Sequence, residues 1–152
     1  GTVESLERLH GMLADSDDPE RQAQIEAAID VRTRYLKDLA GLRMVLPDRT
    51  FTGRTRIDPG GRQVVLIDVG PAHTAGDLVV HLPGEGVTMV GDLLEEGELW
   101  LEGADIRGWV AALDTVLALE PGTLLIGHGG VHTDLALLRA QRAELISLLE
   151  DG

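Results

Sequence analysis

The first 41 residues carry apolar side chains at helical spacing. The text "SDDPERQAQIEAAIDVRTRYLKDLAG" places a capping Asp18 before a proline, repeats apolar residues from Ile25 to Leu39, and stops at Gly41. The preceding "VESLERLHGML" repeats valine and leucine at the same spacing. The pattern predicts two helices, of which the second spans residues 18–40.

From residue 50 onward the pattern changes to alternation. "TFTGRTRI" alternates, "DPGG" supplies turn residues, and "RQVVLIDV" is a β-branched apolar run. Residues 50–69 are therefore predicted to form a hairpin with a buried second strand. "DLVVHL" and "VTMVG" flank the turn residues 83–86 and predict a second hairpin.

The remaining third of the chain combines helix and strand signals. "ADIRGWVAALDTVLALEPG" has one apolar stripe that ends at Pro121, "TLLIGHGG" indicates a short buried strand, and residues 133–149 indicate a last helix. The order ααββββαβα predicts an α/β fold in which helices flank a mixed sheet. We treat residues 1–152 as a single domain, helical over 1–41 and carrying its motifs over 50–150.

The composition fits one domain with a hydrophobic core. The chain has 152 residues, of which 43% are apolar, and this length and apolar content suffice for a compact fold. The 26 acidic and 13 basic residues give a formal charge of −13, which repels phosphate backbones and anionic membrane surfaces. We therefore expect neither a nucleic acid nor a membrane as a partner.

The chain contains no cysteine, so any metal must be held by His, Asp or Glu. Its apolar runs fall short of the roughly 18 residues that a membrane span needs, and the amino end has no leader-like region. We expect a soluble, cytoplasmic protein. Because the first residue is Gly1 instead of methionine, we also expect a processed or partial product of a longer reading frame.

Three predicted strands are followed by a side chain that can bind metal. "LIDVGPAH" ends in His73, "TMVGD" in Asp92 and "LLIGH" in His128. Strand ends at one edge of a sheet can aim polar groups at a common point. Two imidazoles and a carboxylate suit Zn²⁺, and also Fe or Mn, so we expect these three side chains to converge. The competing interpretation is that each is a turn residue bonded to nearby backbone amides.

The other polar candidates have simpler explanations. Asp77 either orients a metal ligand or is a turn residue. His10, His81 and His132 are expected to be solvated, since His81 falls on the polar phase of its strand and the other two lie in or beside helices. Trp100 lies in "LLEEGELWLEG", which we interpret as a solvated loop, although a substrate wall is the alternative.

The three motifs together resemble a known family. "GPAHTAGDLVVHLP", "VTMVGDLL" and "LLIGHGG" are similar to the third, fourth and fifth metal motifs of the metallo-β-lactamase-fold hydrolases, and the resemblance covers residues 50–150. It implies that His73 completes a first zinc site, that Asp92 bridges two zinc ions, and that His128 completes the second site. It also implies half of an αββα sandwich, in which a mixed sheet is flanked by helices.

The family's amino-terminal motif, H-x-H-x-D-H, does not occur in these 152 residues. The resemblance thus implies the carboxy-terminal half of a hydrolase, in which a metal-bound hydroxide attacks an ester, thioester or amide-like bond of a small-molecule substrate. We expect weak zinc binding and little turnover without the other half. The alternatives are a non-catalytic binding or assembly module derived from the fold, and structural turns in an unrelated α/β domain.

Loss of one sheet from a sandwich would uncover an apolar face on the other sheet. The residues concerned lie in the ranges 64–67, 78–82 and 87–90. A large apolar face is not tolerated on a soluble monomer. We expect it to be covered by a second copy in a homodimer, by a complementing amino-terminal half, or by the helix at residues 18–40.

Overall fold

The computed structural model describes residues 2–150, with side chains from Val3 onward. The chain divides into two compact units, Gly1–Asp48 and Arg49–Gly152, each of which is described by itself. Whether residues 1–152 act as a single domain stays a prediction.

The first unit is a pair of helices, α1 (Thr2–Ala14) and α2 (Pro19–Leu39). The Asp18 side chain caps α2 by accepting a hydrogen bond from the Glu20 amide at 3.0 Å, which satisfies one of the free amides of the first turn. The two helices are joined by a 3.0 Å hydrogen bond from the Arg32 guanidinium to the Ser5 hydroxyl. Both helices predicted from the periodicity are thus confirmed.

The second unit contains a mixed sheet of six strands in sequential order. Its strands are β1 (Arg54–Ile57), β2 (Val64–Gly70), β3 (Asp77–Leu82), β4 (Val87–Gly91), β5 (Thr123–Ile126) and β6 (Val131–His132). The two predicted hairpins are confirmed as antiparallel pairs, β1 with β2 and β3 with β4. Strands β4 and β5 are parallel because a helix connects them. Strand β6, which the sequence did not predict, turns back antiparallel to β5.

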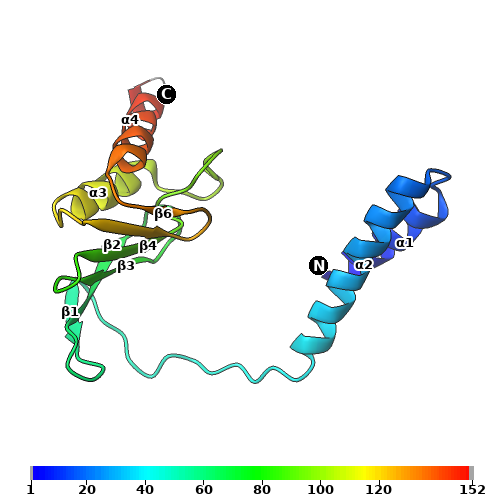
Figure 1. Cartoon of the computed structure of the whole chain (residues 1–152), viewed down its shortest axis with the longest axis horizontal. Coiled ribbons are helices and arrows are strands. Elements are labelled where there is room, and N and C mark those ends of the chain that lie inside the picture. Colours follow the sequence, from blue (N-terminus) through cyan, green and yellow to red (C-terminus); the bar gives the residue numbers. More distant parts are fainter. Residues whose placement is uncertain (1, 151–152) are drawn as a thin grey trace. The chain divides into compact units, whose positions relative to one another are not determined.

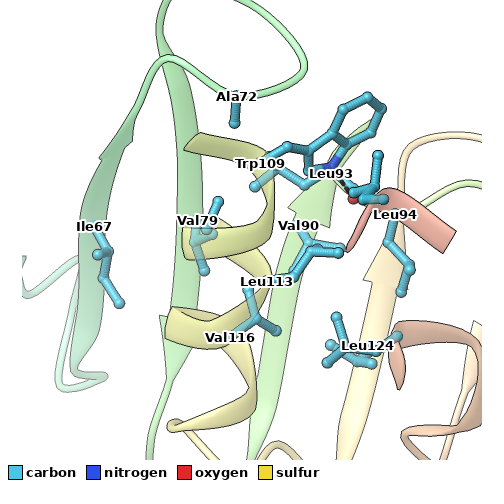
Figure 2. Close-up of a cluster of buried hydrophobic side chains, with 13 residues drawn as sticks. Ile67, Ala72, Val79, Val90, Leu93, Leu94, Trp109, Leu113, Val116 and Leu124 are labelled. Atoms are coloured by element: carbon cyan, nitrogen blue, oxygen red, sulfur yellow. Dashed lines mark hydrogen bonds between the residues drawn. The ribbon is translucent and has the colours of Figure 1, made fainter. Parts of the chain in front are cut away.

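Two helices, α3 (Ile106–Leu117) and α4 (Ala136–Glu150), cover one face of this sheet (Figure 1). The core between the layers is built from aliphatic side chains of four strands and from the apolar stripe of α3 (Figure 2). Its fully buried members include Val79, Val90, Leu124, Trp109 and Leu113. The α/β fold with a mixed sheet and flanking helices is confirmed. Within residues 2–150, no helix is long and apolar enough to cross a membrane.

The opposite face of the sheet carries a row of apolar residues. The register places Leu66 opposite Val80, Val80 opposite Met89, Met89 opposite Leu125, and Leu125 opposite Val131. Directly paired residues point to the same side of a sheet, so the row crosses five strands. Within this row Met89 is 39% exposed and Val131 is 65% exposed. The helix layer leaves this apolar face uncovered.

Gly108 allows α3 to approach the loop that follows β2. A Cβ atom on Gly108 would overlap the carbonyl oxygen of Pro71 and lie 3.1 Å from its carbonyl carbon. The neighbouring Asp105 amide donates to the Ala72 carbonyl at 2.8 Å. A glycine here therefore lets the helix contact the backbone that leads to His73.

The substitution Gly108→Ala should destabilise the second unit, although alanine is the better helix former by about 0.5–1 kcal/mol. Overpacking against fixed backbone costs about 1–3 kcal/mol, so the free energy of unfolding in urea should fall. Gly11→Ala in α1 is the matched control, because a Cβ there meets nothing within 4 Å. Equal stability of the Gly108→Ala and Gly11→Ala variants would contradict the close approach.

Candidate metal site

Asp92 and His128 lie together at the carboxyl ends of two parallel strands. Strands β4 and β5 run side by side, with Gly91 paired to Ile126, and the Gly127 amide donates to the Gly91 carbonyl at 3.0 Å. The residues that follow these two strands are therefore neighbours. The Nε2 atom of His128 lies 3.7 Å from Oδ1 of Asp92, and their side chains are 82% and 40% exposed. Two of the three strand ends that were expected to converge therefore lie together, whereas the convergence of all three side chains, including His73, stays a prediction.

Gly127 packs directly against the Asp92 carboxylate. A Cβ atom on Gly127 would overlap Oδ1 of Asp92 and would lie 3.0 Å from its Cγ and 3.1 Å from its amide nitrogen. The carboxylate thus occupies the volume that any side chain at residue 127 would need. This contact explains why a glycine precedes His128.

His73 follows β2 and lies against different partners. Its ring meets that of Trp109 edge to face, with 5.1 Å between centroids, and its Nε2 atom is 3.9 Å from Oε1 of Glu95. Both side chains of the His73–Glu95 pair are only 13% exposed. Asp77 closes the turn after His73 by accepting hydrogen bonds from the Thr74 amide at 2.7 Å and the Thr74 hydroxyl at 2.8 Å. Asp77 is therefore the first residue of β3, and its side chain stabilises the turn that precedes this strand.

Buried hydrogen bonds fix the loop between Asp92 and Glu95. The Leu93 carbonyl accepts from the Trp109 indole at 2.8 Å and from the Gln141 amide group at 2.8 Å. The side-chain oxygen of Gln141 accepts from the Glu95 amide at 3.0 Å. Sequence reasoning missed Glu95 and Gln141. The only signal was a polar Gln141 within the apolar stripe of a helix.

Two histidines expected to be solvated are partly buried instead. His81 lies on the helix side of the sheet, where its Nδ1 atom is 2.8 Å from the hydroxyl of the fully buried Thr88. His132 belongs to β6, and its side chain is only 20% exposed. The interpretation of both as solvated was wrong, because strand pairing turns each of them toward the layer of helices. His10 is exposed as expected, and Trp100, at 64% exposure, lies in a solvated loop.

The Asp92–His128 pair fits two ligand positions of one zinc ion. Zinc binds carboxylate oxygen and imidazole nitrogen at about 2.0–2.2 Å, so donors 3.7 Å apart can share an ion. A catalytic zinc site uses three protein ligands. Within residues 2–150, no three His, Asp or Glu side chains are grouped so as to hold a metal. The role of His73 as a further ligand stays a prediction.

The comparisons with known proteins agree with this fold. A family model described as the metallo-beta-lactamase superfamily matches residues 8–128, and the chain belongs to this superfamily. No curated protein matches it significantly.

Solved metallo-beta-lactamases share the fold. The enzyme from Pontibacter korlensis has a TM-score of 0.60 and 23% identity, over 76% of this chain and 55% of that one. The DIM-1 enzyme has a TM-score of 0.59 and 19% identity, over 78% and 56%. VMB-1 has a TM-score of 0.58 and 21% identity, over 78% and 55%. The chain thus spans about half the length of these structures.

The substitution Gly127→Ala should displace the Asp92 carboxylate and lower the free energy of unfolding by about 1–3 kcal/mol, as expected for overpacking. Gly84→Ala, in the turn between β3 and β4, is the control, since a Cβ there meets nothing within 4 Å. Urea unfolding followed by circular dichroism measures both variants. If Gly127→Ala were as stable as Gly84→Ala, the tight fit of carboxylate and glycine would be refuted.

Proposed function

We propose that this chain is the carboxy-terminal part of a metal-dependent hydrolase of the metallo-beta-lactamase superfamily. The observation that carries the proposal is the Asp92–His128 pair, 3.7 Å apart at the ends of two parallel strands, in a chain that belongs to this superfamily. In this proposal Asp92, His128 and His73 contribute ligands to a zinc centre, and a segment outside these 152 residues supplies the rest.

The chemistry of such a centre assigns roles to the residues of this chain. Zinc held by Asp92, His128 and His73 would supply Lewis-acid chemistry toward the carbonyl of an ester, thioester or amide-like small molecule. Asp92 supplies negative charge that balances the cation, and His128 supplies a neutral nitrogen donor. Gly127 and the Leu93 carbonyl hold the Asp92 segment in place, because metal affinity depends on how firmly the ligands are oriented.

The missing ligands and the uncovered sheet face suggest the same partner. The apolar row from Leu66 to Val131 lies on the face away from α3 and α4, and the solved relatives are nearly twice as long as the part that this chain matches. One complementing segment would cover the row and complete the ligand set. A second copy of the chain would cover the row without supplying an H-x-H-x-D-H motif.

A non-catalytic binding or assembly module is the second candidate. It is favoured by the absence of a three-ligand group within residues 2–150. The two candidates differ in whether Asp92 and His128 bind metal, so metal affinity separates them.

Asp92→Ala and His128→Ala should each lower zinc affinity at least tenfold, because each removes one of the few ligands that this chain offers to the ion. Competition between metal-free chain and a chromophoric chelator measures the affinity. His10→Ala, on the exposed face of α1, is the matched control and should change nothing.

Equal zinc affinity in the wild type and in the Asp92→Ala/His128→Ala double variant would refute the proposed metal centre. The chain alone should also hydrolyse generic ester and lactam substrates very slowly. Tight, stoichiometric zinc with full turnover would show that no outside ligands are needed.

The apolar face of the sheet leads us to expect self-association of the chain. Without a complementing segment the chain should self-associate at micromolar concentration, since a large exposed apolar patch favours association. Met89→Lys should shift light-scattering masses toward the monomer. Leu148→Lys, a 42% exposed leucine on α4, is the control and should not. A wild-type chain that stays monomeric at all concentrations would contradict this account of the face.

A further inference from the structure

His132 has a buried nitrogen that the proposed zinc chemistry does not use. In the register of β5 and β6, His132 lies opposite Leu124, which is fully buried on the helix side of the sheet. The Nε2 atom of His132 is buried and has no hydrogen bond. It lies 3.0 Å from Oε1 of Glu96, a close contact without hydrogen-bond geometry.

Glu96 reaches His132 from the loop that follows β4. This loop begins with Asp92, and Glu96 is four residues further on. The carboxylate of Glu96 also lies over the turn between β5 and β6. Its Oε2 atom is 2.7 Å from the place of a Cβ on Gly129, and its Oε1 atom is 3.5 Å from that of a Cβ on Gly130. A side chain at residue 129 would therefore collide with this carboxylate and with Cδ1 of Ile126, at 2.5 Å, whereas one at residue 130 would be in ordinary contact with it.

The turn that Glu96 covers is the turn that carries His128. His128 itself is 82% exposed on its side chain, so packing does little to hold its backbone. Gly129, with φ of 139°, adopts a conformation that side chains rarely permit. A turn with three glycines around an exposed histidine needs an anchor, because glycine has the largest conformational freedom of any residue.

We propose that Glu96 and His132 are positioning residues that clasp the β5–β6 turn to the Asp92 loop and thereby hold His128 beside Asp92. The role of this clasp in holding a metal ligand rests on the proposed function, whereas the anchoring of the turn by Glu96 and His132 does not. Glu96 joins the two segments that provide the Asp92–His128 pair, and His132 fixes the far end of the turn. In this proposal neither side chain is a metal ligand.

Amide hydrogen exchange of the metal-free chain tests the clasp. Glu96→Ala should speed exchange at residues 128–131 at least tenfold and leave α2 unchanged. Glu98→Ala, an exposed glutamate of the same loop, is the matched control and should have no effect. Glu96→Gln keeps the shape and removes the charge, so it serves where Glu96→Ala does not fold.

Two further measurements separate positioning from general stability. The imidazole nitrogen signals of His132 should shift in Glu96→Gln and stay in place in Glu98→Gln, because Oε1 of Glu96 lies 3.0 Å from Nε2 of His132. Zinc affinity should fall about 10–100-fold in Glu96→Gln, the usual loss when a group that orients a ligand is removed.

Unchanged exchange at residues 128–131 and unchanged His132 signals in Glu96→Gln would overturn the clasp. Faster exchange with wild-type zinc affinity would overturn its role in positioning His128. If Asp92→Ala also leaves zinc affinity unchanged, the proposed function fails, while faster exchange in the Glu96 variants still supports the clasp itself.

Discussion

The carbonyl oxygen of Leu93 ties both helices of the second unit to the loop that follows β4. It is buried, and it accepts one hydrogen bond from the Trp109 indole of α3 and one from the Gln141 side chain of α4. A buried carbonyl left without partners costs about 1–3 kcal/mol. Both helices must therefore lie where their donors reach this oxygen, and the loop after β4 must present it to them.

The hydrogen bonds to Leu93 also fix the surroundings of two candidate metal ligands, Asp92 and His73. Asp92 directly precedes Leu93, and the indole ring that bonds the Leu93 carbonyl also packs against His73. Gly127 lets β5 end close beneath the Asp92 carboxylate. The parallel pairing of β4 and β5 then brings Asp92 and His128 together, with 3.7 Å between Oδ1 of Asp92 and Nε2 of His128.

Periodicity was enough to predict β1 to β5, the helices and the strand ends that carry Asp92 and His128, since these depend on neighbours in sequence. It could not predict β6, because a strand of two residues, Val131–His132, is too short to carry a periodic signal. Periodicity also could not predict contacts between residues that are far apart in the sequence. The bond between Gln141 and the Glu95 amide joins residues 46 apart, and the buried position of His132 follows from its pairing with β5.

The most direct test of the account is a zinc titration of the chain followed through the imidazole nitrogen signals of all five histidines. The account predicts that the Nε2 signal of His128 moves first, that Asp92→Asn abolishes this movement, and that the signals of His10 and His81 stay fixed. Movement of His10 alone, or of His128 equally in wild type and Asp92→Asn, would contradict a metal centre built on Asp92 and His128.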